Sequence, residues 1–205
     1  MHKRVAIKQW QNPRLVVPVI LLLLLFFVAG IFARRGFFDS EIALLRWVYA
    51  WPHWLLSAFF VITQFGSGWA LIVSCAVVVW KRSVSEGLLL ALSSFFVLLA
   101  IEIAKQLVAR PRPYAVFSDI ARRDTLTHGG FGFPSGHATI AVFLACYLAT
   151  LLPRRHRPWL LLGVFLIGLS RLYLGMHNLL DVIGGACLGG AIGLLVYGPK
   201  LLAKK

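Results

Sequence analysis

The stretch LVVPVILLLLLFFVAGIFA, from Leu15 to Ala33, decides the class of fold. Its 19 residues carry no charge, and about 20 mostly apolar residues suffice for a helix that crosses a bilayer. A basic segment precedes it, as in a secretory signal peptide, but the apolar core of a signal peptide has only about 7 to 15 residues. The stretch therefore predicts a first membrane helix that is retained in the protein.

The composition of the whole chain agrees with a membrane protein. Apolar residues make up 60% of the 205 residues, charged residues only 14%, and the mean hydropathy is +0.82. Such values are wrong for a soluble domain and predict an all-α membrane protein with a single domain, 1–205. The net charge of +14 would suggest nucleic-acid binding in a soluble protein. Here the basic residues gather at the ends of apolar runs and meet lipid headgroups, so nucleic acid is excluded as a partner.

Six transmembrane helices in one bundle are expected from the continuous apolar stretches. They cover residues 15–33, 55–80, 86–108, 136–152, 159–175 and 179–198. Gly66, Ser67 and Gly68 interrupt the second of them. The segment before it, Ser40 to Trp51, is amphipathic and is expected to lie along the membrane interface.

The positive-inside rule predicts the orientation of this bundle. With an even number of spans both termini lie on one side, and that side carries 12 lysines and arginines against 9 on the other. Three of the 9 fall in the motifs described below, and setting them apart leaves 12 against 6. A multi-pass protein of a bacterial-type cytoplasmic (inner) membrane is therefore expected, with both termini in the cytoplasm and the motifs on the periplasmic or extracellular side.

A stripe of small residues in the last span points to close helix packing. Gly185, Gly189 and Gly193 recur every four residues, so they share one face of the helix. Packing inside the bundle is favoured over dimerisation, and the oligomeric state is left open.

His177 and Asp181 are the first candidates for chemistry. They are four residues apart at the start of the last span, so both side chains share a face if the helix includes both residues. A carboxylate that accepts the Nδ1 proton of an imidazole fixes its tautomer and stabilises the charge that forms when Nε2 attacks a substrate. For an isolated pair, however, a structural contact between helix ends is the more frequent explanation.

The string FPSGH, Phe133 to His137, stands directly before an apolar span. Ser135 occupies a capping position, and Gly136 allows a close approach to the backbone. The free amides and the dipole of a helix start favour an anion such as phosphate, and His137 is well placed to give a proton to a departing oxygen. Taken alone, Ser-Gly before a helix is most often an ordinary cap.

Three cations complete the candidate site. Lys105 and Arg112 stand at the end of the third span, where two prolines stiffen the turn, and Arg171 belongs to the third motif string. Together they could bind one tetrahedral dianion, since a planar guanidinium matches two phosphoryl oxygens at once.

Local alternatives exist for these and the neighbouring cations. Lys105 has Glu102 one turn earlier, so a local ion pair competes with phosphate binding. Arginines near helix ends commonly reach for lipid headgroups, which suits Arg110, Arg122 and Arg123. Arg122, Arg123 and His128 could also meet a second phosphate, but a solvated basic loop is the simpler interpretation.

Together the three strings resemble the signature of the type 2 phosphatidic acid phosphatase and haloperoxidase superfamily, which reads K-x6-R-P, P-S-G-H and S-R-x5-H-x3-D. Every signature position is matched, and the resemblance covers about residues 95–198 in order and spacing. It implies that His177 is the nucleophile, Asp181 its orienting partner and His137 the general acid. It also implies a phosphate-binding cradle made of Lys105, Arg112, Ser135, Gly136 and Arg171.

The resemblance implies an integral membrane lipid phosphatase that works through a phosphohistidine. Undecaprenyl diphosphate and phosphatidylglycerol phosphate are the main candidate substrates, and lipid A dephosphorylation remains open. No cofactor and no metal are expected, because the chain has only seven acidic residues and few of them on the outer side. A membrane lipid phosphate and the bilayer itself are the expected partners.

Other kinds of protein remain as alternatives. A lipid phosphotransferase would use the same motifs and pass the phosphoryl group to a second lipid, so only acceptor assays separate it from a hydrolase. Haloperoxidase chemistry shares the cradle but suits soluble proteins. A lipid transporter or a non-catalytic scaffold would spread its charges through the spans, whereas here they gather at one face, which favours an enzyme.

Overall fold

The computed structural model describes residues 12–127 and 129–203, which form helices and no strand. The all-helical class expected from the sequence is thereby confirmed. The α-helices are α2 (Pro13–Arg34), α3 (Asp39–Tyr49), α4 (Leu56–Gln64), α5 (Gly68–Lys81), α6 (Val84–Val108), α7 (Pro113–Val116), α8 (Gly136–Leu151), α9 (Arg157–Tyr173) and α10 (Leu179–Ala203), with the 3-10 turns η1 (His53–Leu55) and η2 (Arg154–His156).

Long apolar helices account for the membrane character. Within the described residues three segments are long and apolar enough to cross a bilayer: α2, α6 with its continuation to Val116, and α10. The segments His53–Gln64 and Gly68–Lys81 form a fourth candidate that is bent by 48°, at the interruption that the sequence predicts. α8 has 16 residues and α9 has 17, fewer than the about 20 that a span takes. Helices thus stand at all six expected positions, but length and composition qualify only three or up to four spans.

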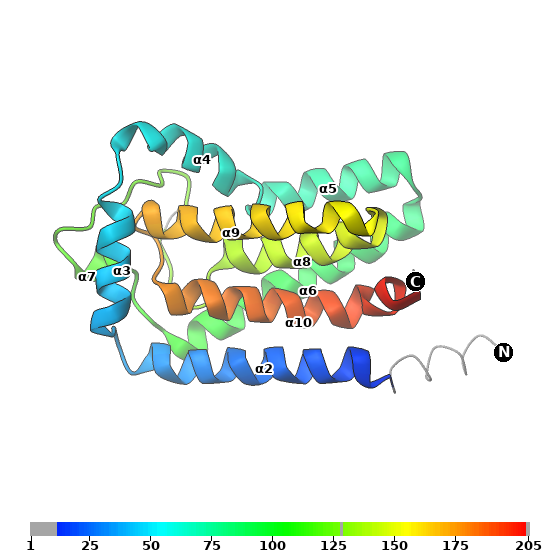
Figure 1. Ribbon diagram of the computed structural model, residues 1–205, viewed down its shortest axis with the longest axis horizontal. Coiled ribbons are helices and arrows are strands. Elements are labelled where there is room, and N and C mark those ends of the chain that lie inside the picture. Colours follow the sequence, from blue (N-terminus) through cyan, green and yellow to red (C-terminus); the bar gives the residue numbers. More distant parts are fainter. Residues whose placement is uncertain (1–11, 128, 204–205) are drawn as a thin grey trace.

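The long helices lie side by side, and α3 runs across one end of the bundle (Figure 1). α10 packs against α8 and α2, and its glycine stripe faces α8. A Cβ added at Gly193 would come within 2.8 Å of Cys146 Sγ, and one at Gly189 would collide with the backbone of Thr139. The prediction that the stripe serves packing inside the bundle is confirmed.

The three motif strings meet at the end of the bundle that α3 crosses. α6 and α9 end there, and α8 and α10 begin there (Figure 1). α6 is closed by Ala109 in a left-handed conformation (φ 51°), a common way for a helix to stop, and the chain then turns into the RPRP segment. The beginning of α2 and the end of α10 lie at the opposite end.

An apolar contact fixes α3 on the bundle. Leu45 and Val48 of α3 are buried in one cluster with Phe59 of α4 and Tyr173 of α9.

Arg123 lies in the long loop between α7 and α8, residues 117–135, and adds to this contact. Its guanidinium lies 3.6 Å from the centre of the Tyr49 ring and donates to the carbonyls of Tyr49 and Tyr173. The prediction that Arg123 reaches for headgroups is therefore wrong. Arg123 instead holds the loop against α3. His128, predicted beside it, lies outside the described residues.

Candidate active site

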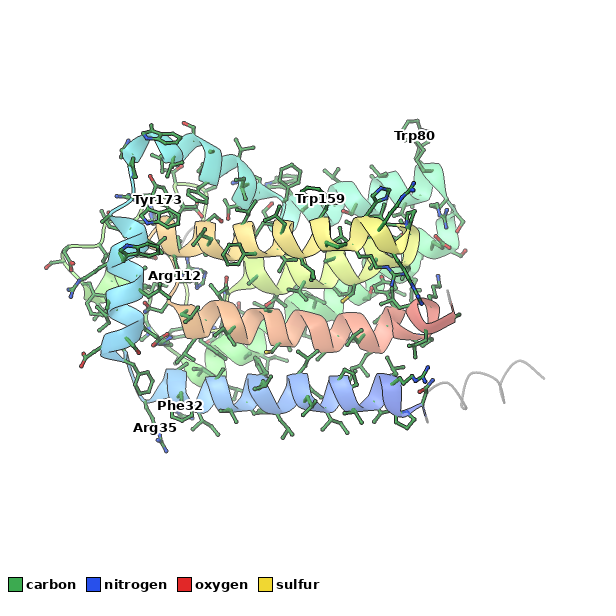
Figure 2. All side chains as sticks on the ribbon, viewed as in Figure 1. Phe32, Arg35, Trp80, Arg112, Trp159 and Tyr173 are labelled. Atoms are coloured by element: carbon green, nitrogen blue, oxygen red, sulfur yellow. The ribbon has the colours of Figure 1, made fainter. Side chains whose placement is uncertain are left out.

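A cavity at the α3 end of the bundle brings the three motif strings together. Its volume is about 320 Å³. Five of the predicted site residues line it: Lys105, Arg112, Gly136, His137 and His177. Figure 2 shows Arg112 at this end of the bundle, near α3. Residues far apart in the chain therefore face one small space.

His177 lies in the turn before α10 and not on the helix itself. α10 begins at Leu179, so the shared helix face expected for His177 and Asp181 does not form. The two side chains meet in another way, because Asp181 in the first turn reaches back, and its Oδ2 accepts the backbone N–H of Asn178 at 2.9 Å. This is the geometry of a helix N-terminal cap. The same oxygen lies 3.7 Å from His177 Nδ1, so the pair is close but not hydrogen-bonded.

The environment of His177 favours a neutral ring. The residue is 2% exposed, and its Nδ1 has no hydrogen-bond partner in the described part of the chain. Burial, followed by the positive charges of Arg112 and Arg171, lowers the pKa of His177 well below its ordinary value of 6.5. The imidazole therefore keeps a lone pair at neutral pH, as a nucleophile requires.

Ser135 caps α8, as the sequence predicts. Its hydroxyl accepts the backbone N–H of Ala138 at 3.5 Å, and its own N–H donates to the carbonyl of Asp181 at 2.8 Å. This backbone bond joins the second motif string to the third. Gly136 and His137, the first two residues of α8, consequently face the cavity that His177 lines.

The two cradle arginines are buried and only partly satisfied. Arg112 donates from Nε to the carbonyl of Gly130 at 3.2 Å, and its Nη1 has no partner among the described residues. Arg171 donates from Nη1 to Asp124 and to Thr63, both at 2.9 Å. Its Nε and Nη2 have no partner among the described residues. Buried N–H groups are nearly always hydrogen-bonded, so these free donors indicate where a ligand's oxygens would bind.

Lys105 is free for a ligand as well. Within the described chain no carboxylate lies within 4.0 Å of its ammonium group. The carboxylate of Glu102, its predicted competitor, accepts a hydrogen bond from Gln106 at 2.7 Å instead. The alternative of a local ion pair is therefore wrong.

Two residues that the sequence analysis does not single out hold Arg171. Asp124 of the long loop is 1% exposed and pairs with Arg171 at 2.9 Å, and Thr63 of α4 shares the same nitrogen. Although burial raises the pKa of Asp124, the hydrogen bond from Thr127 and the charge of Arg171 lower it from 3.8 to about 2. An acid within a basic loop was the only available signal.

The prediction that Arg110 reaches for lipid headgroups is also wrong. Its side chain is 1% exposed and forms ion pairs with Glu41 at 2.6 Å and with Asp181 at 2.8 Å. Glu41 lies 69 positions earlier in the chain, so nothing near Arg110 in the sequence indicates this partner.

The fold and the cavity together define a class of protein. It is a helical membrane protein in which two imidazoles, an ammonium group and the guanidinium of Arg112 line one space. Arg171 does not line this space, but its charge acts on both imidazoles. Such a set of groups is suited to a phosphoryl group. No cluster of three or more His, Cys, Asp or Glu side chains that could hold a metal occurs in the described ranges.

Residues 86–199, more than half of the chain, match the PAP2 superfamily, and the chain belongs to this superfamily. The resemblance seen in the three motif strings is confirmed.

Individual relatives are similar over part of their length. The chain is 35% identical over 128 residues to phosphatidylglycerophosphatase B of Bacillus subtilis (strain 168), which covers 57% of the chain and 59% of that protein. It is 30% identical over 127 residues to undecaprenyl-diphosphatase of Sulfolobus acidocaldarius, covering 60% of the chain and 59% of that protein. The chain thus spans less than two thirds of these relatives.

A solved structure agrees over almost the whole fold. The crystal structure of a transmembrane PAP2 type phosphatidylglycerolphosphate phosphatase from Bacillus subtilis superposes with a TM-score of 0.73 at 26% identity. The match covers 88% of this chain and 94% of the other. The likeness of fold therefore extends beyond residues 86–199.

Proposed function

We propose that the protein hydrolyses a terminal phosphate or diphosphate of a membrane lipid, with His177 as the nucleophile. The observation that carries this proposal is the convergence of His137, His177 and the cationic side chains on one cavity. The unpaired N–H groups of Arg112 and Arg171 support the same proposal, because they have no acceptor among the described residues and can bind phosphate oxygens.

The proposed reaction proceeds in two steps. The Nε2 lone pair of His177 forms a bond to phosphorus, and the bond from phosphorus to the leaving oxygen breaks. His137, which takes up a proton when the negatively charged substrate binds, donates this proton to the leaving oxygen. Water then attacks the phosphohistidine, His137 takes its proton, and inorganic phosphate leaves. Asp181 lies on the Nδ1 side of the ring, where it stabilises the positive charge of the first step. No step uses a metal.

The cations provide most of the proposed rate enhancement. Arg112 and Arg171 are held by hydrogen bonds before substrate arrives, so they stabilise charge on the equatorial oxygens with little reorganisation, and Lys105 adds a third positive charge. The loss of one such donor typically lowers the rate by about 10² to 10³. The backbone N–H groups at the N-terminus of α8, which begins at Gly136, complete the cradle.

An apolar groove next to the cavity supports a lipid substrate. It has a volume of about 870 Å³, lies between α5 and α6, and shares Gly68, Leu98, Thr127 and His137 with the cavity. A headgroup phosphate at His177 would therefore continue into hydrocarbon tails between the helices.

We also propose that the cavity opens on the outer side of a bacterial-type cytoplasmic membrane, with both chain ends inside. Exposed basic residues support this orientation. Among the described residues, six lie at the end opposite the cavity (Arg14, Lys81, Arg82, Arg154, Arg155 and Lys200), against four at the cavity end (Arg34, Arg35, Arg46 and Arg122).

The main test measures phosphate release by the purified protein in detergent, with EDTA present. The panel contains undecaprenyl diphosphate, phosphatidylglycerol phosphate and lipid A. We expect release from at least one of these lipids, and no release by His177→Ala. His156→Ala, an exposed histidine at the far end of the bundle, is the matched control and should behave as wild type.

Three outcomes would contradict the proposal. Normal hydrolysis by His177→Ala would end the nucleophile assignment. Activity that requires added magnesium would point to another class of enzyme. Phosphate that appears on a second lipid, and not in water, would show a phosphotransferase.

A second test addresses the groove. A Cβ at Gly68 meets nothing within 4 Å, so Gly68→Leu should fill the junction of groove and cavity without a backbone clash. We expect a higher KM for long-chain lipid phosphates and little change for a short soluble phosphate ester. Equal effects on the KM of both substrates would show that the groove does not bind the lipid tails.

A further inference from the structure

The carboxylate of Asp181 contacts a charged side chain in addition to the neutral His177 ring. This side chain, Arg110, is not a residue of the family signature. Asp181 Oδ1 accepts Nη1 of Arg110 at 2.8 Å, while Oδ2 faces the imidazole. Arg110 also donates from Nη2 to the carbonyl of Gly36 at 2.8 Å. It is 2% exposed and is not part of the cavity lining.

Glu41 holds the other side of the same guanidinium. Its Oε2 accepts Nη2 of Arg110 at 2.6 Å and its Oε1 accepts Nη1 at 3.3 Å. Oε1 also accepts the backbone N–H of Leu180, in the first turn of α10, at 2.9 Å. Glu41 is 5% exposed, so α3 inserts a buried carboxylate behind the catalytic turn.

Both Nη groups of Arg110 are therefore saturated and its Nε has no partner, whereas Arg112 keeps a free Nη1 and Arg171 a free Nη2 among the described residues. A guanidinium whose Nη protons are all engaged cannot fork onto a phosphate. The role of Arg110 must lie in what it holds, which is the carboxylate beside His177.

The charges of this chain of groups explain why Glu41 is needed. The positive charges of Arg112, Arg171 and Lys105 all act on the His177 ring, and Arg112 and Lys105 line the cavity with it. Arg110 alone would neutralise Asp181 from behind. With Glu41 added, two carboxylates and one guanidinium leave a net negative charge behind the ring, where it offsets the cations when the imidazole becomes positive.

We propose that Glu41 and Arg110 are positioning residues for His177, and that they act through Asp181. This inference rests on the proposed function, in which His177 is the nucleophile. It makes α3, which lies outside the matched stretch of the superfamily, part of the support of the active site.

The test uses Glu41→Gln in the full chain. Glutamine keeps the shape and can still accept hydrogen bonds, but the net negative charge is lost. We expect kcat to fall by about 10- to 100-fold, the range typical of carboxylates that orient a functional histidine. KM and the inhibition constant of inorganic phosphate should stay unchanged, because the cradle is untouched. Glu41→Asp, which keeps the charge on a shorter side chain, should lose less and serves if Glu41→Gln does not fold.

The matched control is Asp119→Asn, which removes another ion pair of α3. Asp119 pairs with Arg46 of α3 at 2.7 Å, and both side chains are about half exposed. This variant disturbs α3 without touching Asp181 and should keep wild-type kcat. Equal losses in Asp119→Asn and Glu41→Gln, or a wild-type kcat in Glu41→Gln, would overturn the positioning role.

A second readout needs no turnover. In protein labelled with 15N-histidine, the ring nitrogen signals of His177 are those that disappear in His177→Ala. Glu41→Gln should shift these signals, and Asp119→Asn should not. A wild type that releases no phosphate would refute the proposed function, whereas unchanged His177 signals in Glu41→Gln would refute the positioning role itself.

Discussion

Arginine occurs at both ends of the bundle, but within the described residues the buried arginines all lie at the cavity end. At the cavity end three arginines are at most 3% exposed: Arg110, Arg112 and Arg171. At the other end, where Figure 2 shows Trp80, the arginines Arg82, Arg154 and Arg155 are exposed. Burying a charge is costly unless it is paired, whereas an exposed one contributes little to stability. The surroundings, and not the residue type, thus separate the arginines that serve the site from those that serve orientation.

The cavity end itself contains two kinds of buried arginine. Arg110 has both Nη groups engaged by oxygens of Glu41, Asp181 and Gly36. Arg112 and Arg171 each have an Nη group without a partner among the described residues, whereas in Arg110 only Nε lacks one. The first kind supports the framework, and the second is prepared for a ligand.

Among the variants that test this comparison of arginines, Arg171→Lys is expected to have the largest effect. Lysine keeps the charge but loses the fork that bonds Asp124 and Thr63 while presenting further donors to phosphate. We expect kcat/KM for the lipid substrate to fall by about 10² to 10³. Arg155→Lys at the opposite end is the control and should retain full activity. Similar activities of the two variants would remove the distinction between the ends.

A smaller loss is expected for Asp124→Asn. The carboxylate aligns Arg171, and a hydrogen bond to a charged group contributes about 1.5 to 3 kcal/mol, so kcat/KM should drop by roughly tenfold or more. In the Arg171→Lys background, Asp124→Asn should have little further effect, because the guanidinium that Asp124 aligns is gone. Additive losses, measured as kcat/KM of the four proteins, would show that Asp124 acts elsewhere.

The pH dependence of stability should reveal the same ion pair. The pKa of Asp124 is lowered from 3.8 to about 2, so its stabilisation is complete above about pH 4 and is lost as the pH falls toward 2. We expect wild type to have a higher Tm than Asp124→Asn at pH 5 to 7. The difference should shrink below pH 4, as measured by thermal unfolding in detergent. A difference that grows with acidity would contradict the assigned pair.

The smallest effect is expected at the far end of the bundle. Arg154→Ala and Arg155→Ala should leave kcat and KM unchanged, because neither residue lines the cavity. A green fluorescent protein fused after Lys205 should fluoresce in cells, since it folds in the cytoplasm if both chain ends lie there. Absence of fluorescence from a well-expressed fusion would reverse the proposed orientation.

Local patterns were enough to predict most helices. The apolar runs mark the helix positions, and Gly66 to Gly68 mark the break that bends the chain by 48°. The expected amphipathic segment 40–51 is α3, Asp39–Tyr49. The number of spans could not be derived in this way, because α8 has 16 residues and α9 has 17, fewer than the about 20 residues of a span.

The candidate site was predictable only where its residues follow one another in a motif. Spacing identifies Lys105, Arg112 and His177, and the structure brings them to one cavity. Arg110 and Arg112 are both followed by proline in the RPRP segment, and which of them faces the cavity depends on how the chain leaves α6 at Ala109. The partners that hold the arginines, such as Glu41 and Thr63, come from distant segments that no local pattern connects.

Because Glu41 of α3 lies behind the catalytic turn, the smallest part of the chain that could carry the active site to another protein includes α3. A designed protein that carried only residues 86–199 would contain every signature residue, yet it would leave Arg110 facing Asp181 without its second acid and Arg171 without Thr63. Grafting this chemistry onto a new scaffold would require a helix laid across the mouth of the bundle, with an acid pointing inward.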